Sequence, residues 1–263
     1  MKIGILYICT GKYSVFWENF HKTCEENFLE GIEKHYFIFT DNKEIKSQDN
    51  VHVKFEKPKG FPLDSLLRFK MFLSVQEKLK EFDYLFFFNS NMSFVQNINS
   101  EMLPLNDQDL IGVLHPGYYN KNANSFPFER NKKSNAYIKF EKEGKYHYFM
   151  GGVNGGKADS FIELSQNLSD AIDKDLQNNI MAIYHDESHI NRYFHDKGKK
   201  VLILNSSYGY PEDSNLPLVP KIIIMNKIKH AGKYFDKLPK TSYFLRLRKK
   251  IVRAYNSFIW KYQ

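Results

Sequence analysis

The chain has 263 residues, of which 42% are hydrophobic and 16% aromatic, so it is long enough to bury one large core. Residues 241–263 hold six basic side chains and no acidic one, so only +2 of the net charge of +8 belongs to the other 240 residues. This near-neutral body lacks the concentrated basic face of a nucleic-acid-binding protein, and no nucleic-acid partner is expected.

The first third of the chain predicts strands alternating with helices. The expected elements, in order, are a strand at 3–9, a helix at 13–29, strands at 36–40 and 51–55, a helix at 66–82 and a strand at 84–88. This alternation predicts an α/β sandwich with a mainly parallel, mixed central sheet.

Cysteine usage and hydropathy bear on the cellular compartment. The two cysteines, Cys9 and Cys24, give no disulfide framework and fit a reducing environment. The apolar run at 3–9 lacks the small-residue cleavage site of a signal peptide. No segment approaches the length of apolar chain that spans a bilayer. We therefore expect a cytoplasmic protein.

The strand at 84–88 ends abruptly in three polar residues, Asn89-Ser90-Asn91. Its apolar run, LFFF, is typical of a strand buried on both faces of a parallel sheet. Ligands of open α/β sheets bind just beyond the carboxyl ends of the strands. An ordinary turn also explains such a triplet. The triplet is therefore a candidate site that needs support from other motifs.

Two further segments have features of a ligand site. His115 stands beside a turn and two tyrosines, and aromatic rings with polar tips suit a sugar, although a lone histidine is usually structural. Residues 150–156, MGGVNGG, hold four of the fourteen glycines, which indicates close approach of the backbone to another element or to a ligand. They do not match G-x-G-x-x-G, so no dinucleotide site is expected.

The segment HDESH has three interpretations. His185 and His189 are four residues apart, as in the zinc motif H-E-x-x-H, but Asp186 replaces the glutamate base and His195 is the nearest third ligand. This zinc hydrolase interpretation is remote. A helix could instead begin here, with Asp186 as its cap and Glu187 favoured by the helix dipole. The third interpretation depends on the complete set of motifs.

Seven motifs occur in a fixed order along the chain. They are TGKY at 10–13, SLLRF at 65–69, DYLFFFNSNMSF at 83–94, HPGYYNK at 115–121, ER….SNAYI at 129–138, MGGVNGG at 150–156 and HDESHINRYF at 185–194. In this set and order the chain resembles glycosyltransferase family 6, which includes the blood-group A and B transferases, and is most similar to its bacterial members. The resemblance extends from about residue 3 to about residue 235.

The resemblance implies a GT-A fold and a retaining hexosyltransferase of bacterial surface-glycan synthesis. The expected donor is UDP-N-acetylgalactosamine (UDP-GalNAc) or UDP-galactose (UDP-Gal). The expected acceptor is the 3-hydroxyl of a β-galactoside, commonly with a 2-linked fucose. A catalytically silent relative that binds a nucleotide-sugar or glycan is the alternative, but the presence of Arg68, Asp186 and Glu187 together favours an enzyme.

The resemblance also implies which residues bind the donor. Ile8, Cys9, Thr10 and Tyr13 fall where the family holds the uridine, with the Tyr13 ring against the uracil. Arg68 falls on an arginine that reaches the donor, and a guanidinium suits phosphate or sugar hydroxyls.

The sugar-binding and acceptor roles fall on the later motifs. Asp186 would hold hydroxyls of the donor sugar. Glu187 matches the carboxylate beneath the anomeric carbon, as a nucleophile or as a stabiliser of positive charge, and it also faces the acceptor. His115 and Tyr184 fall on acceptor positions, where Tyr184 replaces a tryptophan common in the family.

The glycine block is expected to set the choice of donor. Met150, Gly151 and Gly152 fall on donor-binding positions, and the residue at 152 faces the C2 substituent in the family. Gly152 has no Cβ and so leaves room for an acetamido group, which favours UDP-GalNAc. Met150 is larger and resembles galactose-specific relatives.

The family's metal-binding triplet Asp-x-Asp is replaced here by amides at Asn89 and Asn91, as in the bacterial branch. Because divalent cations prefer charged oxygen ligands, we expect no metal cofactor. The two amides would instead donate hydrogen bonds to phosphate or ribose oxygens. Lys227, Lys229 and Lys233 lie where a basic C-terminal segment closes over the diphosphate in the family.

The chain is expected to consist of a catalytic domain at 1–240 and a basic amphipathic tail at 241–263. On a helical wheel the tail has an apolar stripe opposite its basic residues, and Trp260 suits the headgroup region. We expect peripheral contact with the inner membrane surface. The alternative is a helix packed on the catalytic body or on a partner subunit.

Overall fold

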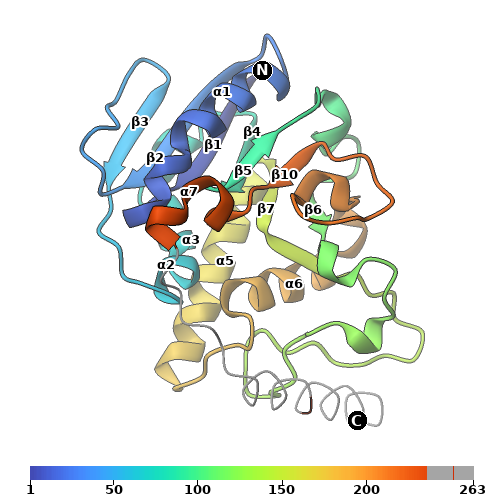
Figure 1. The fold of residues 1–263 in the computed structure, drawn as a ribbon. Coiled ribbons are helices and arrows are strands. Elements are labelled where there is room, and N and C mark those ends of the chain that lie inside the picture. Colours follow the sequence, from blue (N-terminus) through green and yellow to red (C-terminus); the bar gives the residue numbers. More distant parts are fainter. Residues whose placement is uncertain (236–250, 252–263) are drawn as a thin grey trace.

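The protein is described by a computed structural model that places residues 1–235 and residue 251 (Figure 1). The predicted domain boundary at residue 240 and the predicted tail at 241–263 lie outside the described residues, apart from position 251. The boundary and the membrane contact of the tail therefore stay predictions. Within the described part of the chain, no helix is long and apolar enough to cross a membrane.

A seven-stranded central sheet has the strand order β3-β2-β1-β4-β7-β6-β8. Its strands are β1 (Lys2–Ile8), β2 (Glu33–Thr40), β3 (Val51–Phe55), β4 (Tyr84–Asn89), β6 (Leu110–Leu114), β7 (Phe149–Lys157) and β8 (Val201–Leu204). The pairs β3–β2, β2–β1, β1–β4 and β6–β8 are parallel, whereas β7 runs antiparallel to β4 and β6. The mixed, mostly parallel sheet confirms the predicted α/β class with a GT-A-like fold.

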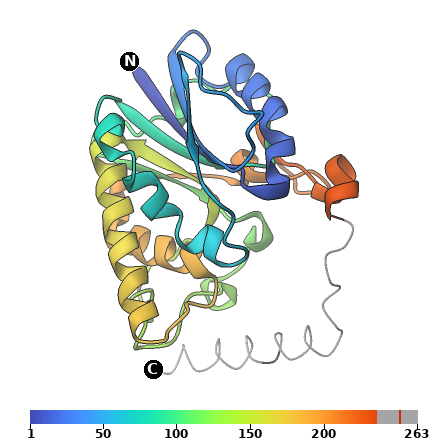
Figure 2. The ribbon, with the colours of Figure 1, turned by 90° about the vertical axis from the view of Figure 1, so that its left-hand side faces the viewer.

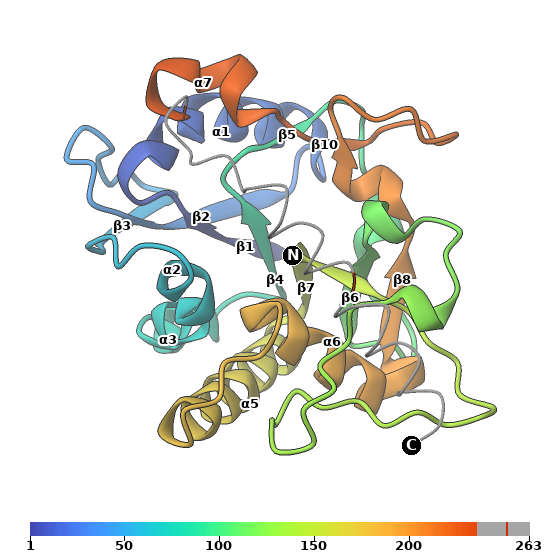
Figure 3. The same cartoon turned by 60° about the horizontal axis from the view of Figure 1, so that its bottom comes forward.

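A small second sheet and four longer helices surround the central sheet. The second sheet combines β5 (Met92–Phe94), β10 (Ile222–Ile224) and β9 (Tyr210–Pro211). The helices are α1 (Trp17–Asn27), α5 (Ala158–Gln177), α6 (His185–Lys197) and α7 (Lys227–Phe235). In Figure 3, α7 lies beside α1, in agreement with the contact of Phe16 with Phe235.

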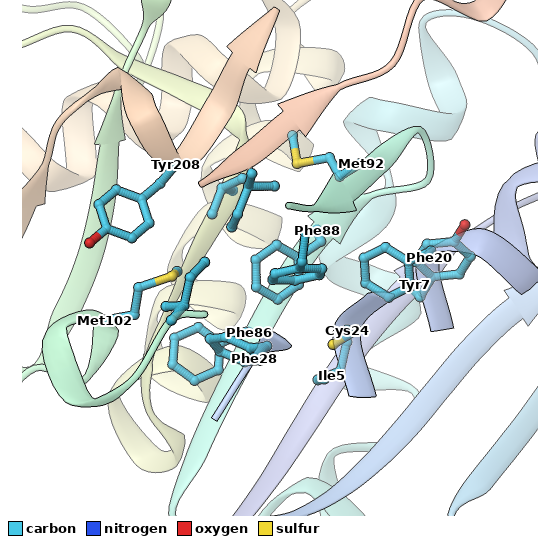
Figure 4. Close-up of a cluster of buried hydrophobic side chains, with 14 of the residues drawn as sticks. Ile5, Tyr7, Phe20, Cys24, Phe28, Phe86, Phe88, Met92, Met102 and Tyr208 are labelled. Carbon is cyan, nitrogen blue, oxygen red and sulfur yellow. The ribbon is translucent and has the colours of Figure 1, made fainter. Parts of the chain in front are cut away.

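The core is divided by the sheet into two layers, with α1 on one face and α5 on the other (Figure 2). On the first face, Phe20 and Cys24 of α1 pack with Ile5 and Tyr7 of β1 (Figure 4). On the second face, helices α5 and α6 pack on the alternate side chains, such as Leu6. Both faces are apolar because the central strands are covered on both sides.

The predicted helices at 13–29 and 66–82 differ in detail from the structure. The first begins as a 3₁₀ segment, Gly11–Phe16, before α1. The second prediction is wrong as a single helix, because the segment forms three short ones, α2 (Leu63–Leu66), α3 (Arg68–Leu73) and α4 (Gln76–Leu79). Non-helical dihedral angles at Leu67 and Val75 separate them. Burial of their apolar side chains against the sheet has overridden continuous helix propensity.

The prediction for residues 84–88 is confirmed. Leu85 to Phe88 are buried within β4, which lies in the middle of the sheet. Parallel pairing sets Ile8 of β1 opposite Asn89 of β4, so both strands end at the same edge. The predicted triplet therefore follows directly where a ligand of such a sheet would bind.

Candidate active site

A cavity of about 190 Å³ lies at the carboxyl ends of β1 and β4. Seven of the predicted donor-binding residues line it: Ile8, Thr10, Tyr13, Arg68, Asn89, Asn91 and Lys227. No donor role was predicted for the other five: Phe61, Asp64, Ser65, Phe87 and Ser90. Three of these lie in or just before α2, and the sequence signal there was the SLLRF motif, which begins at Ser65. The cavity therefore joins segments that are far apart in the sequence.

Cys9 is a predicted donor residue that lies in the core rather than on the cavity wall. Its side chain is fully buried, and burial raises the pKa of the thiol to about 12. Its backbone N–H donates to Phe39 and its carbonyl accepts from the Thr40 hydroxyl, at 3.0 and 2.9 Å. Cys9 thus stabilises the end of β1 from behind and remains a neutral thiol.

Arg68 and Asp186 form a buried ion pair beside the cavity, with Nη2 and Oδ2 3.1 Å apart. The guanidinium lies over the rings of Phe87 and Phe69, at 4.4 and 5.0 Å from their centroids. Burial raises the pKa of Asp186, and the Arg68 charge opposes that rise. The Arg68 Nε group has no hydrogen-bond partner within the described residues, whereas Nη2 lies against Asp186. Guanidinium N–H donors of this kind suit phosphate or sugar oxygens.

Glu187 is fixed by two hydrogen bonds to its carboxylate. The Tyr148 hydroxyl donates to Oε1 and the Gly151 backbone N–H donates to Oε2, both at 2.7 Å. Burial raises the pKa of Glu187 to about 7. The sequence predicted no role for Tyr148, because Tyr148 and its partner Glu187 are 39 residues apart. The result is an oriented carboxylate that is poised between its charged and neutral forms at neutral pH.

The glycines of β7 make room for polar side chains on both neighbouring elements. A Cβ on Gly151 would lie 3.3 Å from Glu187 Cβ and 3.5 Å from Asp186 Oδ2. A Cβ on Gly152 would lie 2.7 Å from Asn89 Nδ2. Met150 is buried and packs on Gly209. Gly151 therefore approaches the acidic pair Asp186 and Glu187, and Gly152 approaches Asn89, as the glycine block predicted. The role of Met150 and Gly152 in donor choice stays a prediction.

The three predicted lysines lie in or at the start of α7 and differ in their contacts. Lys227 Nζ donates to the Tyr13 hydroxyl at 2.9 Å and lies 4.6 Å from the centroid of that ring. Lys229 instead pairs with Glu212 at 2.6 Å, away from the cavity lining. The side chain of Lys233 lies outside the described part of the structure. Of these lysines, the structure brings Lys227 to the cavity.

The two asparagines of the triplet have different environments. Asn89 is exposed, whereas Asn91 is buried and donates from Nδ2 to the Met225 carbonyl at 2.8 Å. The Met225 N–H donates back to the Asn91 carbonyl, also at 2.8 Å. Neutral amides of this kind are poor ligands for a divalent cation. The described residues also contain no group of three His, Cys, Asp or Glu that fits a metal. Asn89 and Asn91 therefore offer no charged oxygen to a metal such as Mn²⁺, and the absence of a metal cofactor stays a prediction.

The predicted acceptor residue His115 lies next to the catalytic candidate. Its Nδ1 accepts from the Gly117 N–H at 3.0 Å, so the neutral ring carries its proton on Nε2. Its ring centroid is 5.7 Å from that of Tyr148, the partner of Glu187. Burial lowers the pKa of His115. Tyr184 directly precedes α6, which carries Glu187, so both acceptor candidates adjoin the same carboxylate.

The contacts do not support the zinc interpretation of HDESH, whereas the predicted helix does begin here, at His185, with Asp186 and Glu187 in its first turn. His189 Nε2 lies 3.5 Å from Asp175, and the His195 ring stacks on Tyr146 at 5.4 Å, so the histidines have separate partners. The interpretation of Asp186 as the cap is wrong, because the N-cap is Tyr184 and its side chain makes no cap hydrogen bond. Asp186 pairs instead with the buried guanidinium of Arg68.

Three buried polar side chains hold α6 in place. Asn191 accepts from the Phe149 N–H and donates to the Phe149 carbonyl, both at 2.8 Å. Glu129 accepts from the Ile183 N–H at 2.7 Å, just before the helix. Asp175 accepts from the Ser134 hydroxyl and from the backbone and side-chain N–H groups of Asn135. It also lies 3.5 Å from His189 of α6. The ER….SNAYI and HDESHIN motifs contained several of these residues, but not the identity of their partners.

Replacing Glu187 with Gln should make protein stability less dependent on pH. A folded-state pKa raised to about 7 stabilises the protein fully below pH 4.5, and this stability is lost as pH rises through 7. Gln can accept from Gly151 and donate to Tyr148, so both contacts persist. Glu187→Gln should therefore be more stable than the native protein at pH 8, by at most about 3 kcal/mol, and similar at pH 5.

Urea unfolding at both pH values measures this difference. Glu30 is exposed, so Glu30→Gln provides the control. It should change the free energy of unfolding by nearly zero at both pH values. A Glu187→Gln protein that is destabilised equally at pH 5 and pH 8 would contradict the raised pKa.

The chain is similar in sequence to known glycosyltransferases. The chain is 39% identical over 233 residues to the O-antigen biosynthesis glycosyltransferase WbnI of Escherichia coli, a match that covers 88% of this chain and 97% of that protein. It is 33% identical over 237 residues to globoside alpha-1,3-N-acetylgalactosaminyltransferase 1 of Gallus gallus, covering 86% of this chain and 66% of that protein. It is also 33% identical over 240 residues to histo-blood group ABO system transferase 1 of Rattus norvegicus, covering 88% and 66%.

The match is therefore nearly complete for the bacterial relative and covers 66% of the length of each of these two animal relatives. The sequence model of glycosyltransferase family 6 matches residues 1–237, which includes the cavity, the acidic pair and the glycine block. From this match and these identities, the chain belongs to glycosyltransferase family 6.

Proposed function

We propose that this glycosyltransferase is a retaining α-1,3-hexosyltransferase that moves GalNAc or Gal from a UDP-sugar to the 3-hydroxyl of a galactoside. The preferred acceptor carries a 2-linked fucose, and the reaction serves bacterial surface-glycan synthesis. One observation carries the proposal: the carboxylate of Glu187 is fixed by Tyr148 and Gly151 beside the Arg68–Asp186 pair. The names of the blood-group and globoside relatives support the sugar class.

Glu187 supplies the group that a retaining transfer needs. As the bond between the anomeric carbon and UDP breaks, positive charge develops on the sugar. An ionised carboxylate near that carbon stabilises the charge or attacks the carbon. Its orientation costs no further reorganisation, because Tyr148 and Gly151 already hold both oxygens. With a pKa near 7, the carboxylate is increasingly ionised above neutral pH.

The departing UDP is neutralised by side chains in this proposal. Arg68 lines the cavity and its Nε has no hydrogen-bond partner within the described residues, and Lys227 reaches the same cavity from α7. Charge-assisted hydrogen bonds from such groups stabilise phosphate oxygens. Asn89 is exposed at the cavity and offers an amide donor. No step requires a divalent metal.

Changing Glu187 to Gln should leave donor binding intact and collapse transfer. The neutral amide keeps the shape but cannot stabilise positive charge. We expect the rate to fall by more than about tenfold, which is 1.4 kcal/mol in the transition state. Transfer by the native enzyme should also rise between pH 6 and pH 8 as Glu187 ionises. Steady-state assays and UDP titrations measure both effects; a Glu187→Gln enzyme within about tenfold of native activity would remove the assigned role.

Chelation should affect transfer less than removal of Lys227 does. Lys227→Ala deletes a positive charge at the cavity, so we expect a loss of at least about tenfold, whereas EDTA should leave turnover unchanged. Lys80→Ala is a matched control, because Lys80 is exposed and pairs with Glu77 on α4. Activity that EDTA abolishes and Mn²⁺ restores would refute the metal-independent proposal.

UDP-GalNAc should be preferred over UDP-Gal as donor. Gly152, the residue predicted to face the C2 substituent, adds no side chain there, and the nearest group in its Cβ direction is the Asn89 amide, the end of a flexible side chain. Initial rates with each UDP-sugar, using 2-fucosylated and plain galactosides, measure donor and acceptor choice together. A preference for UDP-Gal of about tenfold or more, equal to 1.4 kcal/mol, would overturn the expectation. Absence of turnover with every pair would favour the catalytically silent alternative.

A further inference from the structure

A second cavity, of about 520 Å³, lies directly behind the wall of the donor cavity. The 3₁₀ segment Gly11–Phe16 separates the two. Tyr13 lines the donor cavity, whereas Gly11, Lys12 and Ser14 line the second one. The other wall of the second cavity is the loop that follows β2. The cavity thus lies at the carboxyl ends of β1 and β2, the sheet edge at which ligands of α/β proteins bind.

We infer that this second cavity binds a neutral oligosaccharide, separately from the donor. Its volume lies within the range of small-molecule sites, roughly 300–1,000 Å³. The proposed function enters in one respect, because it suggests a galactoside as the oligosaccharide. The presence of a second site depends on the cavity itself and not on the transfer reaction.

The charges on the cavity wall favour a neutral ligand over a phosphate. Two lysines, Lys12 and Lys46, are balanced by two acids, Glu18 and Glu44. The donor cavity instead carries two cations, Arg68 and Lys227, against one acid, Asp64. A nucleotide or an anionic sugar would meet as much repulsion as attraction here. A polyhydroxylated neutral molecule can use the acids as acceptors and the lysines as donors.

The polar groups on this wall are available for a ligand. The side chains of Lys12, Glu18, Glu44, Lys46 and Gln48 have no hydrogen bond or ion pair within the described residues. Oppositely charged side chains on one cavity wall that do not pair leave both donors and acceptors open. Gln48 adds an amide, which offers a donor and an acceptor together. Hydroxyl groups of a sugar need that mixture.

Trp17 supplies a fixed aromatic surface in the same cavity. Its ring contacts Tyr7 and Tyr36, at 5.3 and 5.6 Å between centroids, and His21, which also lines the cavity, stacks on it at 4.8 Å. The ring is only partly buried and lines the cavity. A rigid amphipathic ring offers contact area at low cost in conformational entropy. The apolar face of a sugar ring can pack on it while the hydroxyls reach the polar wall.

The position of Trp17 allows a direct binding experiment. The chain has two tryptophans, Trp17 and Trp260, so a full-length Trp260→Phe protein reports on Trp17 alone. The probe is 2-fucosyllactose, a neutral 2-fucosylated galactoside. We expect a saturable change in tryptophan fluorescence with a Kd on the order of 1 mM. Saturating UDP should change this Kd by less than about twofold, because the donor occupies the other cavity.

Variants of exposed wall residues locate the ligand without risk to the core. In the Trp260→Phe background, Glu44→Ala and Gln48→Ala should each raise the Kd at least about fivefold, since each removes hydrogen-bonding groups from the ligand. Asp49→Ala is the matched control, because Asp49 is exposed in the same loop but does not line the cavity. Its Kd should be unchanged.

Three results would overturn the inference: no saturable change up to about 20 mM probe, displacement of the probe by UDP, or equal Kd values for the wall variants and the native wall. The outcome is distinguishable from that of the proposed function. Saturable binding at Trp17 without transfer would leave this site intact and remove the proposed reaction. Normal transfer without a change in Trp17 fluorescence would leave the proposed reaction intact and remove this site.

Discussion

The docking of helix α6 on strand β7 is the contact on which the rest of the site depends. β4 pairs with β7 only as far as Val153, so the preceding residues of β7 extend beyond it. Side chains of α6 take up backbone groups of this extension. Asn191 bonds both backbone groups of Phe149, and Glu187 accepts from Gly151. Glu187 and Asn191 are four residues apart and so lie on one face of α6. The docking of that face on β7 therefore fixes both side chains.

This docking explains why glycine stands at position 151 and why a carboxylate can be buried there. A Cβ on Gly151 would meet the Cβ of Glu187 at 3.3 Å, so a side chain would push the helix away from the strand. The cost of burying Glu187 appears as its raised pKa. Nearby, Arg68 and Asp186 compensate each other's charge within the same apolar surroundings. The site therefore holds acidic groups in a fixed geometry at the expense of stability above neutral pH.

Local patterns predicted the strands well and the polar contacts poorly. The run LFFF identified β4, and the change to Asn89 identified the cavity edge, because burial and turn chemistry are local properties. The break at Leu67 and the Glu129–Ile183 contact depend on packing between distant segments, and periodicity carries no signal for them. Motif order placed seven of the fourteen predicted donor residues at the cavity. It could not show that Lys229 pairs with Glu212, since that ion pair forms only after folding.

Asn91, in the triplet at the end of β4, replaces an aspartate of the family's metal-binding motif, and its side chain also contacts the segment that leads to Lys227. Asn91 donates from its amide to the Met225 carbonyl, and the Met225 N–H returns a bond to the Asn91 backbone. An aspartate at position 91 has no such donor when ionised, and its charge would oppose the carbonyl dipole. The segment would then lose the side-chain bond to Met225, two residues before Lys227, which reaches Tyr13 at the cavity. The Asn91 amide thus helps to position Lys227, so in the proposed reaction protein charge can take the place of metal charge at the departing diphosphate.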